Sequence, residues 1–205
     1  MKVLLVNGSP HRDGCTNEAL SIIKEELAKN DVDSEIFWIG NRRVRGCVAC
    51  NKCVDDSFCV FTDDCANDLI KEIIDTDGVI IGSPVYFASP NGALCAILDR
   101  VFYNNGKRFA FKPAASIVSC RRGGSTASFD RLNKYFTISN MPVVSSQYWN
   151  GVHGNTPEEV RLDKEGVQIM RTLAKNMAWM LKSISHEDTP ELEDQIFTNF
   201  IRPMK

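Results

Sequence analysis

Hydrophobic residues along the chain fall into short continuous runs, separated by longer segments in which apolar residues recur every three or four positions. The runs predict strands buried on both faces, at residues 2–8, 34–38, 78–83, 114–120 and 141–145. The periodic segments predict helices over residues 91–103 and 125–136, and helices that begin at Thr16, at Asp63 or Asp64, and at Pro157. Strand and helix therefore alternate five times, which is typical of a parallel sheet covered by helices on both faces.

Five consecutive β-α units favour the flavodoxin-like strand order 2-1-3-4-5, which makes a doubly wound, three-layer α/β sandwich. We expect one domain over residues 1–183, with a cysteine-rich insertion at residues 41–62. A chain of this length buries enough surface to fold without disulfides or a metal. Residues 184–205 form a C-terminal tail that we expect to pack on the domain or on a partner subunit. The tail carries a late apolar stripe, which comprises Ile196, Phe197, Phe200 and Ile201.

The charge balance excludes several classes of partner. The 205 residues carry 24 Lys and Arg against 26 Asp and Glu, a formal net charge of −2, so we expect neither nucleic acid nor an anionic membrane as a ligand. No apolar run has the length of a membrane span. Residues 1–8 predict a strand rather than a signal peptide, and we therefore expect a cytoplasmic protein.

Three loops are candidates for a ligand site, because a ligand of an open parallel sheet binds where the strand order reverses. These loops follow the first, third and fourth strands. The first, residues 8–17, combines hydroxyls, an amide and an arginine with the start of a helix, whose N–H groups attract anions. This loop predicts a phosphate site, although it is neither a G-x-G-x-x-G motif nor a P-loop. The alternative is that its Ser-Pro and Asp-Gly pairs only form turns.

The second and third loops carry groups suited to a flat aromatic ring. Between two prolines, Tyr86 and Phe87 predict a rigid surface ledge, whereas the alternative places both rings in the core. In the third loop, Arg121 and Arg122 precede two glycines and can hold a ring edge or a negatively charged group. The alternative for the two arginines is a solvated pair.

Three short motifs together resemble the flavodoxin-like NAD(P)H-dependent FMN reductase family over about residues 1–183: Gly8-Ser9-Pro10 with Thr16, Ser83-Pro84-Val85-Tyr86, and Leu98-Asp99-Arg100. The resemblance implies bound FMN, NAD(P)H as a transient co-substrate, and a homodimer or tetramer. It implies phosphate-side contacts from Ser9, His11, Arg12, Cys15, Thr16 and Asn17. It implies ring-side contacts from Pro84, Val85, Tyr86, Phe87, Ala88, Ser89, Arg121, Arg122, Gly123 and Gly124. Many family members carry Asn where Cys15 stands, so this chain departs from the family at one phosphate-side position.

Cysteines are the compositional feature that sets this chain apart. Five of its 8 cysteines lie between residues 47 and 65, and four of them follow the pattern C-x2-C-x2-C-x5-C: Cys47, Cys50, Cys53 and Cys59. This compact set of thiolates favours a [4Fe–4S] cluster over zinc, which more often uses two separated C-x2-C pairs. Free thiols or another metal are the alternative. The spacing also resembles that of the iron–sulfur flavoproteins, a branch of the same family, and this resemblance implies that the four cysteines are cluster ligands.

The sequence as a whole predicts an FMN-dependent oxidoreductase, in which the flavin carries the chemistry and no side chain is required as a general acid or base. One hypothesis is an NAD(P)H-linked flavin or quinone reductase. A second is an electron-transfer flavoprotein fed by ferredoxin, and a third is a non-enzymatic redox sensor. Asp99 and Arg100, which are adjacent in the sequence, predict a structural ion pair and not a catalytic one.

Overall fold

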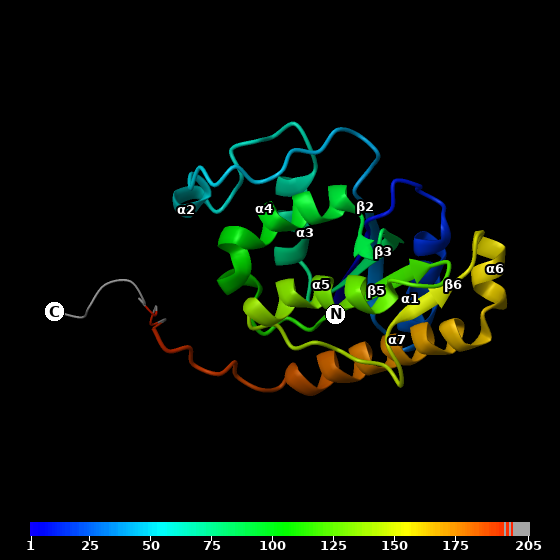
Figure 1. Cartoon of the computed structure of the whole chain (residues 1–205). Coiled ribbons are helices and arrows are strands. Elements are labelled where there is room, and N and C mark those ends of the chain that lie inside the picture. The colour runs from blue at the N-terminus through cyan, green and yellow to red at the C-terminus, as the bar shows by residue number, and fades with distance from the viewer. Residues whose placement is uncertain (195, 197, 199–205) are drawn as a thin grey trace.

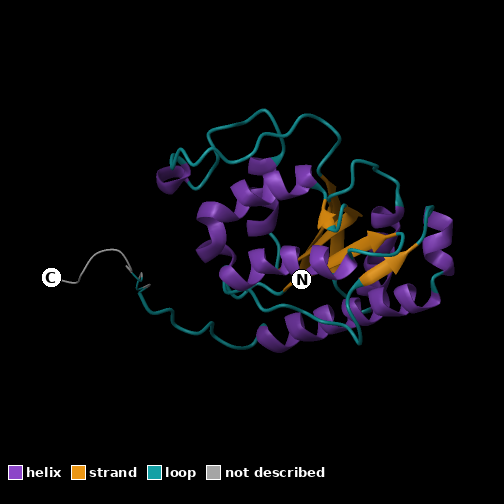
Figure 2. Cartoon of the chain, in the orientation of Figure 1, coloured by secondary structure: helices purple, strands orange, loops and turns teal. Residues whose placement is uncertain are grey.

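A single sheet lies between two layers of helices in the computed structural model, which describes residues 1–194, 196 and 198 (Figures 1 and 2). The strands are β1 (Lys2–Asn7), β2 (Asp33–Trp38), β3 (Gly78–Tyr86), β4 (Ser89–Pro90), β5 (Ala114–Cys120) and β6 (Gly151–His153). Five of them are parallel, in the order β2-β1-β3-β5-β6, and the two-residue β4 pairs antiparallel with β3. Counted over the parallel strands alone, this is the predicted order 2-1-3-4-5.

Two hydrophobic cores fill the space between the sheet and its helices. One face is covered by α1 (Cys15–Lys29), α6 (Pro157–Leu162) and α7 (Lys164–Ile184), and the other by α3 (Ala66–Ile74), α4 (Gly92–Phe109) and α5 (Ser125–Ile138). Successive strand residues point to opposite faces, so Val3 and Leu5 of β1 pack in the first core while Leu4 and Val6 pack in the second. A one-turn helix, α2 (Cys53–Asp56), lies within the cysteine segment, which we define as residues 41–62.

The edge strand differs from the predicted one. The sequence predicts a strand at residues 141–145, but only Val143 forms a bridge there, to Ala114, and the regular edge strand is β6. Pro142 has no N–H to donate to a ladder, and its carbonyl accepts from the Ala114 N–H instead. The chain then leaves the sheet and returns at Asn150, whose Nδ2 donates to a β5 carbonyl at 3.1 Å. The predicted fifth strand is therefore interrupted, with its regular part about ten residues later.

Two of the predicted helix starts also differ, and a third predicted helix is divided. The helix expected to begin at Asp63 or Asp64 begins at Ala66, with Cys65 as its N-cap. Thr16 lies inside α1, whose N-cap is Gly14, and its hydroxyl bonds the Ser119 hydroxyl at 2.8 Å. The long helix that begins at Pro157 is divided into α6 and α7 at Asp163. The Asp163 carboxylate accepts from the Gly166 N–H at 3.0 Å, which gives α7 its own N-terminal cap.

Beyond Ile184, where α7 ends, the described part of the C-terminal tail contains neither helix nor strand, and in Figure 1 it runs away from the sheet. Ile196 is exposed, whereas Phe197, Phe200 and Ile201, the rest of the predicted apolar stripe, lie outside the described residues. Packing of this tail on the domain or on a partner therefore stays a prediction. Among the described residues, none of the helices is long and apolar enough to cross a membrane.

Candidate functional site

A cavity of about 760 Å³ opens at the carboxyl ends of β1, β3 and β5, beside the start of α1. We call it the large cavity. Its volume lies in the range of small-molecule and cofactor sites. It occupies the place where the strand order reverses, since the chain runs from β1 to β2 on one side and from β3 to β5 on the other. The three loops that the sequence singled out therefore meet at one site.

The first loop folds into a turn fixed by its own side chains. Asn7 Oδ1 accepts from the Ser9 N–H, and Asn7 Nδ2 donates to the Arg12 carbonyl, both at 3.0 Å. Ser9 Oγ accepts from the His11 N–H at 3.1 Å. The helix α1 begins directly after Gly14, its N-cap, and no side chain caps it. An uncapped helix N-terminus that lines a cavity offers first-turn N–H groups to an anion, as a phosphate site requires.

Two polar contacts that the sequence did not indicate connect this loop to other strands. Trp38 Nε1 donates to the Ser9 carbonyl at 2.8 Å, and the Thr16 hydroxyl bonds that of Ser119. Trp38 ends β2 and Ser119 lies next to the end of β5, so both stand at the carboxyl edge of the sheet. That position is the signal that could have found them, because the last residues of each strand reach the same edge as the loops.

The second loop is a tight hairpin between β3 and β4. Its two central residues have positive φ angles, 51° at Phe87 and 58° at Ala88. Residues other than Gly, Asn and Asp rarely adopt this conformation, and those that do cluster at functional sites. The Phe87 side chain is fully exposed and that of Tyr86 is exposed at 44%, so neither ring fills the core. The surface ledge predicted between the two prolines is therefore present.

The third loop packs directly against this hairpin. Gly124, which precedes α5, has a φ angle of 87°, and a Cβ placed there would lie 2.6 Å from the Ala88 Cα. No side chain fits at that distance, so glycine allows the two loops to touch backbone to backbone. Arg121 and Arg122 are both exposed, and Arg121 lines the large cavity. The third loop thus supports the hairpin at the ring side of the predicted site.

The structure gathers many of the predicted flavin-site residues around the large cavity: Ser9, His11, Arg12, Cys15, Thr16, Pro84, Val85, Tyr86 and Arg121. The remaining predicted residues belong to the same loops but are not among its lining residues: Asn17, Phe87, Ala88, Ser89, Arg122, Gly123 and Gly124. Lining residues outside the predicted set include Trp38, Asn41, Ser119, Cys120, Gly154, Asn155 and Pro157. Contact of each of these residues with a cofactor stays a prediction.

Two thiols in the wall of the large cavity are protonated at neutral pH. The Cys15 thiol donates to the Gly154 carbonyl at 3.6 Å, and burial raises the pKa of Cys15. Cys120 Sγ lies 3.5 Å from His153 Nδ1, and burial also raises the pKa of Cys120. Neither thiol has the lowered pKa of a nucleophilic cysteine. Cys15 therefore lines the predicted phosphate side of the cavity as a neutral side chain.

A second cavity, of about 20 Å³, lies inside the cysteine segment, and all four predicted metal ligands line it: Cys47, Cys50, Cys53 and Cys59. Burial raises the pKa of Cys53, and the neighbouring thiols of Cys59, Cys47 and Cys50 raise it further. Within the described residues, no group of three or more His, Cys, Asp or Glu is arranged to hold a metal ion. That finding concerns a single ion, since the thiolates of a [4Fe–4S] cubane each bind a different iron.

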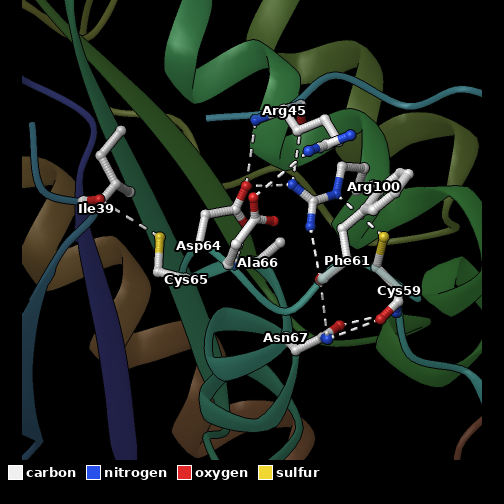
Figure 3. A network of polar contacts seen from close by, with 10 residues as sticks. Ile39, Arg45, Cys59, Phe61, Asp64, Cys65, Ala66, Asn67 and Arg100 are labelled. Carbon is white, nitrogen blue, oxygen red and sulfur yellow. Dashed lines mark hydrogen bonds and ion pairs between the residues drawn. The ribbon is translucent and has the colours of Figure 1, made fainter. Parts of the chain in front are cut away.

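Arg100 reaches from α4 into the cysteine segment (Figure 3). Its Nη1 forms an ion pair with the Asp64 carboxylate, and its Nε donates to Cys59 Sγ at 3.2 Å. Burial opposes the charge on both partners of the ion pair, but their mutual hydrogen bond lowers the pKa of Asp64 and raises the pKa of Arg100. Asp64 Oδ1 also accepts from the Ala66 N–H at 3.1 Å, at the start of α3. The guanidinium therefore joins α4 to the segment that carries the cysteines.

The predicted ion pair between Asp99 and Arg100 is wrong. Asp99 instead pairs with Arg131 at 3.3 Å and accepts from the Tyr135 hydroxyl at 2.5 Å, both from α5. Consecutive helix residues point about 100° apart, so neighbours in the sequence face different elements. Asp99 therefore faces α5 while Arg100 faces the cysteine segment.

Comparison with known proteins agrees with this geometry. Residues 1–156 match the family of NADPH-dependent FMN reductases. The chain is 29% identical over 195 residues to an iron-sulfur flavoprotein of Methanocaldococcus jannaschii, an alignment that covers 90% of this chain and 99% of that protein. It is 28% identical over 189 residues to an iron-sulfur flavoprotein of Methanosarcina thermophila, covering 90% and 97% of the two chains. The solved structure of a flavodoxin from the domain Archaea superposes with a TM-score of 0.61 at 14% identity, covering 89% of this chain and 99% of the flavodoxin.

Proposed function

The chain belongs to the NADPH-dependent FMN reductase family, and on that premise we propose that it is an iron–sulfur flavoprotein, which transfers electrons between FMN and a [4Fe–4S] cluster. The family makes it an FMN-dependent oxidoreductase with a flavodoxin-like fold. The proposal of a [4Fe–4S] cluster rests on one observation: four cysteines line one small cavity. Relatives aligned over nearly their whole length carry the name iron-sulfur flavoprotein, which supports the same proposal.

The large cavity fits FMN in size and in chemistry. The uncapped N-terminus of α1, with Ser9 and Thr16 in the same wall, suits the phosphate, because its N–H groups and hydroxyls donate hydrogen bonds. The ledge at Tyr86 suits the flat ring, and Arg121 suits its polar edge. FMN supplies the redox chemistry when bound, and the protein binds and orients it. The site therefore needs no further catalytic side chain.

The cysteine cavity fits a cluster in the chemistry of its donors. Cys53 and Cys59 are half-buried and Cys47 and Cys50 are exposed, so one side of the set faces the protein and the other faces solvent. Thiolate sulfurs are the ligands of iron–sulfur clusters. Tyr103 lines the same cavity, and its hydroxyl donates to the Asn51 side chain at 2.7 Å, which helps to position the loop between two of the ligands.

One helix, α4, runs from the hairpin beside the large cavity to the cysteine segment. Asn91, the N-cap of α4, directly follows the ring-side hairpin, and its side chain accepts from the Ala93 N–H at 2.7 Å. Arg100 lies nine residues further on, a rise of about 14 Å along the helix. The flavin and the cluster would therefore sit at the start and the middle of α4. This arrangement suits electron transfer within one chain.

The proposal includes a transient electron donor and a homodimer or tetramer. Candidates for the donor are NAD(P)H and reduced ferredoxin. Exposed aromatic rings near the large cavity support an interface there, since large apolar groups on a surface mark association sites. These rings belong to Tyr86, which lines the cavity, and to Phe87, which follows it in the same hairpin.

Anaerobic purification of the full chain tests the proposal. We expect the visible absorption of oxidised flavin, together with about four irons per chain and a broad absorption that bleaches with dithionite. Cys50→Ser should lose iron and keep FMN. Cys65→Ser is the matched control, because Cys65 lies in the same region but does not line the cysteine cavity, and it should keep both.

The donor is identified by the rate of flavin bleaching with NADH, NADPH and reduced ferredoxin in separate reactions. Faster bleaching by ferredoxin would assign an electron-transfer flavoprotein, and faster bleaching by a nicotinamide would assign an NAD(P)H-linked reductase. Absence of iron from anaerobic preparations that contain FMN would refute the cluster and leave a plain flavin reductase. Size-exclusion chromatography with light scattering tests the oligomeric state.

A further inference from the structure

Arg100 is buried against one of the proposed cluster ligands, and we propose that it is a positioning residue that raises the reduction potential of the cluster through a hydrogen bond to Cys59. This inference rests on the proposed function, because it requires the cluster. It comes from the geometry of one side chain on α4, which reaches a cysteine 41 positions away in the sequence.

The Arg100 guanidinium is held in one orientation (Figure 3). Nη1 donates to the Asp64 carboxylate and to the Arg45 carbonyl, the latter at 2.9 Å, and Nη2 donates to the Phe61 carbonyl at 3.1 Å. The side chains of Arg100 and Asp64 are only 1% and 4% exposed. Because the guanidinium is a rigid planar fork, these bonds also fix the direction of the Nε–H, which points at Cys59 Sγ.

Anchoring of the loop does not account for the contact with sulfur. The Asn67 side chain already holds the Cys59 backbone: its Oδ1 accepts from the Cys59 N–H at 2.8 Å, and its Nδ2 donates to the Cys59 carbonyl at 2.9 Å (Figure 3). The Cys59 backbone is thus positioned without Arg100. The Nε–H of Arg100 therefore acts on the Cys59 sulfur itself.

The strength of that contact depends on the charge of the sulfur. A thiol is a weak acceptor, whereas a metal-bound thiolate is negative and accepts a charge-assisted hydrogen bond from a guanidinium. Burial strengthens the bond, because the local dielectric constant is low.

Reduction adds one negative charge to a cluster, so a fixed N–H donor stabilises the reduced form more than the oxidised form. Hydrogen bonds to the sulfurs are among the features that set the potential of a cluster. Asp64 neutralises the net charge of Arg100 while it holds the N–H toward Cys59.

The test uses the full chain, loaded with FMN, iron and sulfide under anaerobic conditions, as wild type, Arg100→Gln, Arg100→Lys and the double variant Asp64→Asn with Arg100→Gln. The double variant avoids leaving a buried carboxylate without its partner, which would threaten folding. Arg131→Gln is the control, because Arg131 lies on the neighbouring α5, where its guanidinium contacts Asp99 of α4 and the Tyr135 hydroxyl rather than the cysteine segment. Redox titration followed by electron paramagnetic resonance gives the cluster potential, and visible absorption gives the flavin potential.

We expect the reduction equilibrium of the cluster to become about tenfold less favourable in the double variant and in Arg100→Gln, which is a fall of about 59 mV for one electron. The flavin potential should not change. Arg100→Lys keeps the positive charge without the fork and should shift the cluster potential less. Arg131→Gln should match wild type.

Several outcomes would overturn the inference. An unshifted cluster potential in iron-loaded Arg100 variants would refute it and leave the proposed function intact. Loss of iron from every Arg100 variant would also refute it, because Arg100 would then serve assembly of the site and not its potential. Wild-type protein that binds FMN but no iron would refute the proposed function, and this inference with it.

Discussion

Left-handed backbone at three residues shapes the two loops beside the predicted ring side of the large cavity. Phe87 and Ala88 form the hairpin turn, and Gly124 packs on Ala88 where a hydrogen fits and a Cβ does not. Gly123, in the same loop, has no positive φ angle and open space around the position of a Cβ. Comparison of alanine substitutions at the two glycines therefore separates the effect of lost close packing from that of an added methyl group.

We expect Gly124→Ala to weaken FMN binding about tenfold or more, because the hairpin must move and the left-handed backbone is strained by about 1–3 kcal/mol in a residue with a Cβ. Fluorescence titration of flavin-free protein with FMN measures the dissociation constant. Gly123→Ala should bind FMN as tightly as wild type. Equal affinities in the two variants would contradict a role for this packing.

Cys65 illustrates how burial alters a thiol that lies outside the cysteine cavity. Its Sγ donates to the Ile39 carbonyl at 3.5 Å, and burial raises the pKa of Cys65 to about 11. In the unfolded chain the pKa is near the ordinary value of 9.0. A thiol with a higher pKa in the folded state contributes stability that is present below the unfolded pKa and is lost as the pH rises through the folded pKa.

The free energy of unfolding should therefore fall more steeply between pH 9 and 11 in wild type than in Cys65→Ala. Denaturant titrations at both ends of this range measure the difference, and comparison of the two proteins removes the contribution of the other titrating groups. Parallel pH profiles would show that Cys65 ionises as freely in the folded chain as in the unfolded one.

The sequence indicates which residues stand at the ends of the strands, but it does not indicate which residues they contact. The turn at residues 8–14 and the helix after it were predictable, because a Ser-Pro and Asp-Gly turn before a helical stripe is a local pattern. The contacts of Trp38 with Ser9 and of Arg100 with Asp64 join residues 29 and 36 positions apart, and no local pattern marks such partners. The sequence predicts that Arg100 pairs with its neighbour Asp99, whereas its partner in the structure is Asp64. Adjacent residues of a helix point in different directions, so the predicted pair does not form.

At the scale of elements, the side chain of one aspartate forms hydrogen bonds to both β6 and α7. Asp163 Oδ1 accepts from the Gly166 N–H, and its Oδ2 accepts from the His153 N–H at 2.8 Å.

The central strands were predictable, because continuous apolar runs mark burial on both faces. The edge strand was not, because it is short and only Val152 among its residues is buried.

Asp163→Ala should lower the free energy of unfolding by about 1–2 kcal/mol, because it removes a helix cap and a strand contact together. Asp163→Asn keeps an acceptor oxygen and should retain most of that stability. Urea unfolding of the two variants and wild type measures both effects. A loss in Asp163→Asn as large as that in Asp163→Ala would show that the negative charge, and not the cap, is what matters.

At the scale of the whole molecule, the two cavities belong to parts that depend on each other little. The cysteine segment lies outside the sheet, alongside α4 (Figure 1). It adds Val44 and Phe58 to the edge of the second core, while most of its other residues are exposed or half-buried. The fully buried residues of both cores all lie outside the cysteine segment.

Replacement of all four proposed ligands by serine should leave FMN binding within about twofold of wild type and the free energy of unfolding within about 2 kcal/mol, because serine is close to cysteine in size and none of the four positions is fully buried. FMN titration and denaturant unfolding measure the two quantities. Loss of FMN from this variant would show that the cysteine segment supports the flavin site. The variant comprises Cys47→Ser, Cys50→Ser, Cys53→Ser and Cys59→Ser.

The short edge strand β6 also bears on how copies of this chain can meet. A long exposed edge strand has free N–H and C=O groups that recruit strands from other molecules. Here the edge has three regular residues, and the Asp163 carboxylate already accepts from the His153 N–H. A second copy has no ladder to extend at this edge. Assembly on this side of the molecule must therefore use side chains of helices and loops, and the folding chain is protected from edge-to-edge aggregation there.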